Sequence, residues 1–487
     1  MDLLAKIITQ MTKEEVRFFR LFVDRQDYAF ARKDKELFDL YREQGEGLNE
    51  RLIAEKWYGK SAGMNSFYRL KNRLLAIVNK SLVVQHMEED ESMKLLYGLL
   101  IYQHHYGQKN YKVAAYYLNK LERTAEKEEQ FSLLDLILSE QIKLTADYTT
   151  ANPKEIIEKR TSNAKKNEPI AALDQILAQI HFDLKVSQNY GRQDTTLYEY
   201  LEQLLKRTSF ENEWKNSRVF QVKFFDAISQ ILLQQHDYIK LETFSQEAIQ
   251  LFKKKKWFDK AHHEIALKMH TYWVNALFKN GRYTQSLKAA EALKNEMEKY
   301  DRMLEDKYLI FYYNALIINY SVIDPVKAIS LLEKLKDEKK IQAESFYFHF
   351  VLINLAILYY RDKNFEKSID HIIALSTRGS FKKAAPLLQL KLAVLELMIR
   401  LERKEFEVIL YRQKQILRQF KSEFESVEGR RQKEMLGLIG MLSKPKLLKD
   451  WKSRLQEFIS NRDNSLPEDA DLIDYDRWAK QQLQQRR

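Results

Sequence analysis

The sequence predicts an all-α protein built from stacked pairs of helices, and three observations support this prediction. The chain has 487 residues, which is long enough for several domains or for one extended array. It contains only 12 Gly and 6 Pro, so it lacks the turns that a β-sandwich or β-barrel needs about every eight to twelve residues. Apolar residues recur at helical spacing, and an aromatic residue that follows a turn-like pair returns at related intervals.

The first 86 residues do not follow this repeat, and we interpret residues 1–86 as an N-terminal helical module. The segments "GEG" and "GKSAG" break the helical pattern. Between these breaks the spacing of apolar residues predicts helices near residues 3–10, 13–25, 34–44, 49–58 and 64–84.

The last two of these helices, joined by a short glycine-containing turn, have the outline of a helix-turn-helix. Phe67, Leu70, Leu74 and Ile77 are predicted to form the inner face of the second helix. Arg and Asn are the side chains that bind guanine and adenine edges in the major groove. The residues of this kind that we expect to point outward are Asn65, Arg69, Asn72 and Arg73. A solvated basic face on a structural helix has the same pattern, and both interpretations remain open.

Five aromatic residues, each after a turn, measure the repeat in the middle of the chain. They are Tyr111, Tyr238, Tyr283, Phe365 and Phe406. Their separations are 238−111=127, 283−238=45, 365−283=82 and 406−365=41. Since 127 is three steps of about 42 and 82 is two steps of 41, the repeat has a period near 41 residues.

Helix-starting motifs occupy the positions where this period leaves gaps. "NPKEII" begins at Asn152 and "DPVKAI" at Asp324, so each places an Asx cap before a proline, which is a favourable start for a helix. The turn-rich "YGRQDTT" at residues 190–196 fills the remaining gap. The sequence therefore predicts about eight helical hairpins, and we assign residues 87–425 to this array.

The second helix of each hairpin has an apolar face and a small residue near its start. Tyr283, Leu287, Ala290 and Leu293 lie at offsets 0, +4, +7 and +10, and the residues from Phe365 to Leu375 repeat these offsets. The small residue three positions after the start lets neighbouring helices approach closely, and it is Ala114, Ser286, Ala328 or Ser368.

With these small and aromatic positions, the chain resembles the tetratricopeptide-like (TPR-like) helical-repeat superfamily over about 330 residues. The period near 41 is longer than the roughly 34 residues of that family. The resemblance implies a right-handed α-α solenoid, because such units cannot bury their apolar faces alone and therefore stack. It also implies that the first helix of each unit lines a concave groove that holds a peptide or a partner protein.

The same resemblance assigns the groove residues of three successive units. Asparagine amides hydrogen-bond the backbone of an extended peptide, and tyrosines add contact area. In this register the groove residues are Lys268, Tyr272, Asn275, Lys279, Tyr313, Asn314, Tyr320, Asn354, Tyr360 and Arg361. These side chains could equally well satisfy hydrogen bonds between helices, so this alternative also stays open.

Residues 426–487 are predicted to form C-terminal capping helices, one near residues 446–460, and a polar tail in which Trp478 is a candidate docking anchor. The net charge of the chain is +12, and basic residues concentrate near this end. The basic side chains that we consider for RNA binding are Lys444, Lys446, Lys449, Lys452 and Arg454. A solvated helix face is the alternative.

Catalytic and metal-binding patterns do not stand out. The chain has no Cys, which excludes disulfides and thiol chemistry, and the adjacent pairs His104-His105 and His262-His263 point to different faces of a helix. We therefore expect a non-enzymatic cytoplasmic scaffold that binds a protein or peptide, without a cofactor and without membrane insertion. A nucleic-acid-binding regulator is the alternative function, and a homodimer through a terminal unit is a further alternative.

Overall fold

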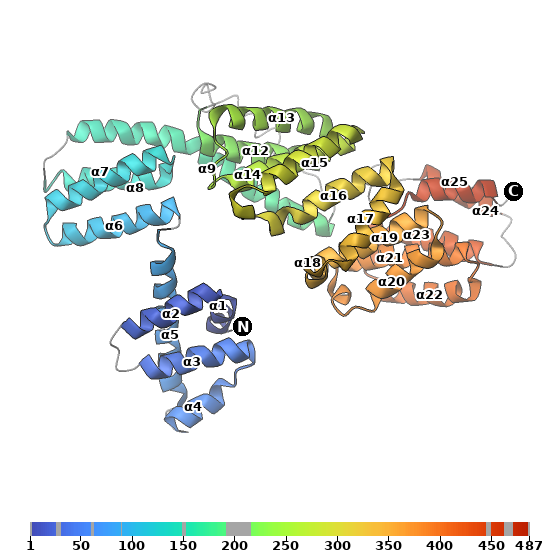
Figure 1. The fold of residues 1–487 in the computed structure, drawn as a ribbon, viewed down its shortest axis with the longest axis horizontal. Helices are drawn as coiled ribbons and strands as arrows, with labels where there is room; N and C mark the ends of the chain where they lie inside the picture. Colours follow the sequence, from blue (N-terminus) through green and yellow to red (C-terminus); the bar gives the residue numbers. More distant parts are fainter. Residues whose placement is uncertain are drawn as a thin grey trace. The chain divides into compact units, whose positions relative to one another are not determined.

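The computed structural model describes residues 2–25, 31–59, 63–88, 90–148, 152–190, 216–444, 450–461 and 471–485. Within these ranges every regular element is a helix, so the predicted all-α class is confirmed (Figure 1). The chain divides into two compact units, residues 1–171 and 172–487. The division falls inside helix α9 and coincides with none of the boundaries predicted from the sequence.

The first unit begins with five α-helices that agree closely with the predicted ones. They are α1 (Leu3–Gln10), α2 (Lys13–Arg25), α3 (Ala31–Gln44), α4 (Glu50–Tyr58) and α5 (Gly63–His86), with a 3-10 turn at Gly45–Gly47. Their shared core contains Phe19 and Phe38, whose ring centroids lie 4.2 Å apart. Phe67, Leu70 and Leu74 of α5 are buried in it as predicted, whereas Ile77 is only partly buried.

Four further helices complete the first unit and enter the second one. They are α6 (Glu91–Gly107), α7 (Tyr111–Lys127), α8 (Phe131–Leu144) and α9 (Pro153–Tyr190). Helices α6 and α7 approach closely at Gly98, where a Cβ atom would lie 2.4 Å from Leu121 Cδ2. The predicted start of a helix at Asn152-Pro153 is confirmed, while residues 191–196 of the predicted "YGRQDTT" turn lie outside the described ranges.

In the described part of the second unit, the first and second helices of successive hairpins follow each other along the chain. Its first members are α12 (Arg218–Gln234), α13 (Tyr238–Lys255), α14 (His263–Lys279), α15 (Tyr283–Met297), α16 (Glu305–Ile323), α17 (Pro325–Asp337) and the short α18 (Lys339–Ala343). The later members are α19 (Ser345–Arg361), α20 (Phe365–Ser376), α21 (Pro386–Glu402), α22 (Phe406–Gln419), α23 (Val427–Leu442), α24 (Trp451–Ser460) and α25 (Tyr475–Gln485). Neighbours in the chain pack against each other (Figure 1).

The aromatic landmarks mark the starts of helices, as predicted. Tyr111, Tyr238, Tyr283, Phe365 and Phe406 are the first residues of α7, α13, α15, α20 and α22. Two positions before each aromatic residue the backbone is left-handed, with φ between 54° and 73°, at Lys109, His236, Gly281, Lys363 and Lys404. The residue between them donates its N–H to a carbonyl of the preceding helix, as Glu405 does to Arg400 at 2.9 Å. This hydrogen bond is typical of helix C-terminal caps, so one corner geometry recurs at all five places.

Only one of these five corners has glycine at the left-handed position. Lys404 has φ 61°, a conformation that places its Cβ close to the following carbonyl oxygen and is unfavourable for residues other than glycine. We therefore expect Lys404→Gly to raise the free energy of unfolding by up to about 1 kcal/mol, measured by urea denaturation. The same exchange at exposed Lys414, inside α22, should instead lower it by about 1 kcal/mol.

Side-chain contacts between successive hairpins recur at nearly constant sequence separations. Gln230 pairs with Tyr272 across 42 residues, Tyr347 with the carbonyl of Asp306 across 41, and Lys307 with Glu264 across 43. Within hairpins, Ser286 Oγ donates to Val274 O and Ser368 Oγ to Ala356 O, each across 12 residues. The small residues at these two positions therefore hold the two helices of a hairpin together, as well as letting them approach.

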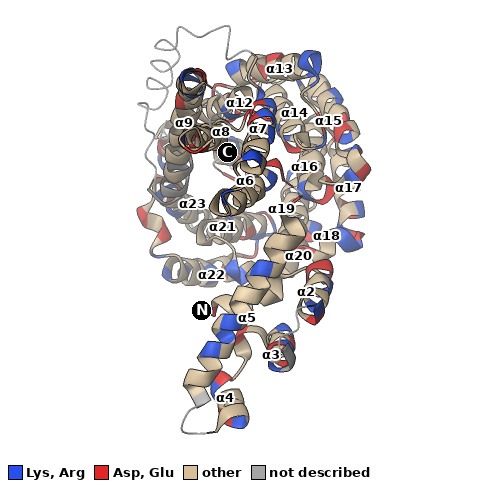
Figure 2. Cartoon of the chain, turned by 90° about the vertical axis from the view of Figure 1, so that its left-hand side faces the viewer, with Lys and Arg blue, Asp and Glu red and all other residues tan. Residues whose placement is uncertain are grey.

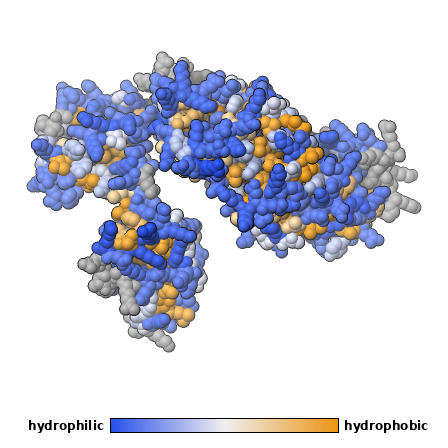
Figure 3. All heavy atoms as spheres, viewed as in Figure 1, coloured by the Kyte–Doolittle hydropathy of each residue, from blue (hydrophilic) through white to orange (hydrophobic). Residues whose placement is uncertain are grey.

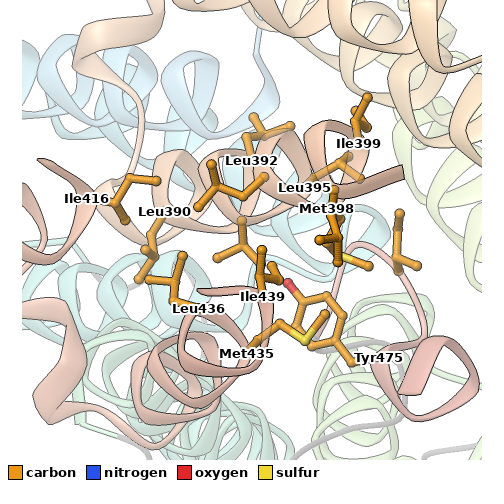
Figure 4. Packing of buried hydrophobic residues seen from close by; sticks show 14 of the residues in the cluster. Leu390, Leu392, Leu395, Met398, Ile399, Ile416, Met435, Leu436, Ile439 and Tyr475 are labelled. Carbon is orange, nitrogen blue, oxygen red and sulfur yellow. The ribbon is translucent and has the colours of Figure 1, made fainter. Parts of the chain in front are cut away.

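The largest apolar core of the second unit joins α19 to α25. Side chains of α21 and α23 interdigitate in it, and Tyr475 of α25 lies beside Met435 and Ile439 (Figure 4). The helix predicted near 446–460 corresponds to α24, which begins, in the described residues, at Trp451 and is followed by α25. Trp478 is 2% exposed and packs in the chain's own core, so it anchors α25 there.

Gly440 of α23 allows a close approach of Gln413 from α22. A Cβ atom on Gly440 would lie 2.4 Å from Gln413 Oε1, and Gln413 Nε2 donates to Leu436 O at 2.8 Å. Gly440→Ala is expected to destabilise the fold by about 2 kcal/mol, because the amide must leave its carbonyl partner. Urea denaturation would show this loss, and Gly437→Ala, which meets nothing within 4 Å, is the control that should not lose stability.

Candidate partner-binding surface

The first helices of the hairpins in the second unit are α12, α14, α16, α19, α21 and α23, and we call their solvent-facing side the first-helix surface. Neighbouring first helices contact each other directly. Lys268 of α14 forms an ion pair with Asp226 of α12 at 2.7 Å, and Lys307 of α16 forms one with Glu264 of α14 at 2.5 Å. The predicted groove residues all belong to α14, α16 or α19.

On α14 the predicted residues are largely engaged within the fold. Tyr272 Oη accepts a hydrogen bond from Gln230 Nε2 at 2.7 Å, and its ring stacks on Phe225. Burial, followed by the nearby Asp226 carboxylate, raises the pKa of Tyr272 well above its ordinary value. The Lys279 ammonium lies 5.6 Å from the centre of the Tyr238 ring. Asn275 is partly buried on the same helix.

On α16 the predicted groove residues have different environments. Tyr313 and Tyr320 pack against a core formed with α17 and α19, and Lys327 lies 4.2 Å above the Tyr320 ring. Asn314 is partly buried on the same helix. The two tyrosines therefore serve packing between hairpins.

Sequence reasoning missed several apolar residues of this surface. Phe311 of α16 is 45% exposed, Val322 at the end of α16 is 49% exposed, and Phe346 at the start of α19 is 70% exposed. Hydrophobic residues gather on the visible face over α16 and α17 (Figure 3). In the sequence, an exposed apolar residue can be recognised only where it interrupts the polar face of a helix. A helix such as α19 is apolar on most faces, so its sequence shows little of this pattern.

On α19 the predicted residues have three different environments. Asn354 Nδ2 donates to Phe350 O in its own helix at 2.8 Å. Tyr360 packs on the core that contains α25, and burial raises its pKa. Arg361 keeps an exposed side chain, yet desolvation and then the neighbouring Arg477 of α25 lower the pKa of its guanidinium. The C-terminal end of α19 therefore faces the chain's own last helix.

Helix α25 is held by polar contacts with α21 and α23. Arg431 Nε lies 2.8 Å from Asp471 Oδ2, and a terminal guanidinium nitrogen of Arg431 lies 2.9 Å from Asp476 Oδ1. Gln432 Nε2 donates to Asp471 at 2.7 Å, and Tyr475 Oη donates to Gln432 Oε1 at 2.6 Å. Gln482 Nε2 donates to Glu402 at 3.0 Å. Part of the first-helix surface is thus already occupied by a helix of the same chain.

The residues proposed for DNA recognition lie on α5. Asn65, Arg69 and Asn72 are exposed, and Lys and Arg residues are spaced along this helix (Figure 2). The Arg73 side chain is 40% exposed, and its guanidinium donates two hydrogen bonds to the buried Asp34, at 3.1 and 2.9 Å. That contact crosses 39 residues and holds α3 against α5. Arg73 is therefore a structural residue of the N-terminal helices.

Among the C-terminal basic residues, Lys446 and Lys449 lie outside the described ranges. Lys444, Lys452 and Arg454 are exposed. Arg454 forms an ion pair with Asp450 at 2.7 Å, and the Lys452 ammonium lies 5.6 Å from the Trp451 ring centre. The described part of this segment therefore offers a modest cationic face.

Neither a metal-binding cluster nor a membrane-spanning helix occurs in the part of the chain that the structure describes. Among them, no group of three or more His, Asp or Glu side chains is arranged to hold a metal ion. No helix in the described ranges combines the length and apolar character needed to cross a membrane. Of the two histidine pairs, His262 Nδ1 lies 2.7 Å from Asp259 and His263 is fully buried, while His104 and His105 differ in exposure.

Comparison with known proteins adds no assignment: the chain matches no protein-family model, and no curated protein matches it significantly.

Proposed function

We propose that this protein is a non-catalytic scaffold or adaptor that binds a peptide or partner protein along the first-helix surface of a TPR-like α-α solenoid. The recurring corner geometry and the contacts at separations near 41 residues support the repeat architecture. Helical units stacked in this way create an extended surface that is preformed, so little conformational entropy is lost on binding.

The observation that carries the proposal is the exposure of large apolar side chains on the first helices α16 and α19. Phe346 is 70% exposed, Phe311 45% and Val322 49%. A partner that covers these side chains removes apolar surface from water, which favours binding. Aromatic side chains are also enriched among the residues that dominate the binding energy of interfaces. The partly buried Asn314 adds an amide that can pair with a polypeptide backbone.

Site-specific photo-crosslinking in cells that naturally contain the protein tests this function. A benzoyl-phenylalanine at position 314 is expected to capture a discrete polypeptide, whereas the same group at exposed Thr284 of α15 should not. The additional change Phe311→Ser should reduce capture at least tenfold, an effect that hardly depends on salt. Equal capture from both positions, or capture of nucleic acid only, would contradict the proposal.

Nucleic-acid binding through α5 is the second candidate, favoured by the exposed Asn65, Arg69 and Asn72 on one helix. It predicts an affinity that falls steeply with salt, because phosphate contacts release counterions. Arg69→Ala should then weaken binding of a mixed-sequence duplex, and Asn79→Ala on the same exposed helix is the matched control.

A further inference from the structure

Helix α25 shows what kind of ligand the first-helix surface accommodates. Its aromatic residues Tyr475 and Trp478 are each 2% exposed and enter the apolar core formed by α19, α21 and α23. Asp471, which precedes the helix, and Asp476, in its first turn, meet the Arg431 guanidinium, whose side chain is only 8% exposed. The helix is therefore held by apolar contacts and by one buried cation near its N-terminal end.

The charges around α25 are complementary at Arg431, which meets two carboxylates. Arg361 of α19 has a mixed environment, because its electrostatic neighbours are the like-charged Arg477 of α25 and, with a smaller effect, Asp474 just before that helix. Burial alone would lower the pKa of Arg431, but hydrogen bonds and charges from Asp471 and Asp476 raise it overall. Acidic residues before and between two aromatic residues, as in "DLIDYDRW" at residues 471–478, are thus the pattern that this surface selects.

The surface does not end where α25 ends. On the same first helix, α19, Phe346 remains 70% exposed, while Tyr360 at the other end packs on the core that includes α25. Phe311 and Val322 extend the apolar character onto α16. A helix in a groove is a common mode of recognition, and its apolar anchors recur at i, i+3 and i+4, the spacing of Tyr475, Trp478 and Ala479.

We propose that the first-helix surface of α19, α21 and α23 is a binding site for an acidic-aromatic amphipathic helix of a partner protein, and that α25 occupies this site in cis. This inference rests on the proposed function and names its ligand class. Because α25 is tethered, its effective concentration at the site is on the order of millimolar, so a partner helix must bind more tightly than α25 or meet a weakened α25. The intramolecular helix α25 therefore sets the minimum affinity that a partner helix needs in order to bind.

A labelled peptide that contains residues 471–485 of this chain, "DLIDYDRWAKQQLQQ", is the probe. Its binding is measured by fluorescence anisotropy to the full chain and to two full-length variants that weaken α25 in different ways. Trp478→Ala removes the buried anchor, and the pair Asp471→Asn and Asp476→Asn removes the charges that Arg431 binds. We expect both variants to bind the peptide at least tenfold more tightly than the unchanged chain.

Two controls make the result specific to the site. Adding Arg431→Gln to either variant is expected to abolish peptide binding, whereas adding Lys433→Gln, an exposed position on the same helix, should leave it unchanged. Hydrogen exchange of residues 471–485 reports whether α25 has been released. A peptide that fails to bind variants in which α25 is released would overturn the inference, and so would continued protection of α25 in both variants. Such a failure would leave crosslinking from position 314 intact, so it can be told apart from failure of the proposed function.

Discussion

Arg431→Ala is expected to lower the free energy of unfolding by about 3–5 kcal/mol, the usual range for breaking a buried ion pair by removing one partner. The Arg431 side chain is 8% exposed, and those of Asp471 and Asp476 are 13% and 15% exposed. The substitution leaves two poorly hydrated carboxylates without their cation. It also removes the guanidinium that lies 4.7 Å from the centre of the Phe458 ring.

Urea denaturation and hydrogen exchange of α25 together measure this effect. Lys433→Ala is the matched control, because it removes a cation from the exposed face of the same helix and should change stability by less than about 0.5 kcal/mol. A similar small change for Arg431→Ala would mean that water screens the ion pairs and that the apolar contacts alone hold α25.

The second large effect is a loss of stability in mild acid, which we attribute first to His270. This side chain of α14 is 2% exposed. Burial lowers its pKa to about 4; Lys253 of α13 and Lys299 add to the effect, while Glu296 of α15 opposes it. In the unfolded chain the same imidazole has a pKa of about 6.5. His263, with no exposed side-chain surface and a ring that contacts Tyr300, has a pKa that burial lowers as well.

The sign of the pH dependence follows from proton binding. Below about pH 6.5 the unfolded chain binds a proton at His270, whereas the folded chain does not until the pH approaches about 4. Stability from the neutral, buried imidazole is therefore complete above about pH 6.5 and is lost progressively as the pH falls to about 4. The loss attributable to His270 is about 3 kcal/mol, from a pKa difference of about 2.5.

Urea denaturation between pH 8 and pH 4.5 measures this dependence. His270→Phe should flatten the pH profile, whatever its effect on stability at pH 8, and His104→Phe, at an exposed position, should not. Identical pH slopes for the unchanged chain and His270→Phe would show that the imidazole becomes charged without opening α14.

Local features of the fold were predictable because they depend on neighbouring residues. The aromatic landmarks begin their helices, Asn152-Pro153 and Asp324-Pro325 start α9 and α17, and Asp324 caps α17 with a side-chain hydrogen bond to Lys327 N–H. Capping and periodicity act over three to four residues, so a sequence displays them directly.

The candidate site was less predictable, because its contacts cross long stretches of chain. Gln482 meets Glu402 across 80 residues, and Tyr475 meets Gln432 across 43. Nothing local in "DYDRWAK" indicates that Trp478 becomes buried, and a pattern of acids and polar residues has the same appearance in a free tail. The assignment of Tyr313 and Tyr320 to packing likewise depends on the neighbouring hairpin, which the periodicity alone does not orient.

The contacts at separations near 41 residues determine how far the destabilisation caused by a mutation extends along the chain. Local unfolding of α14 breaks its contacts with Asp226 and Gln230 of α12 and with Lys307 of α16. It leaves the ion pairs of Arg431 with Asp471 and Asp476 intact. Interactions that reach only the adjacent pair of helices transmit a defect over a short range. On heating, such a chain is expected to open in stages, so that its calorimetric trace is broad and composite.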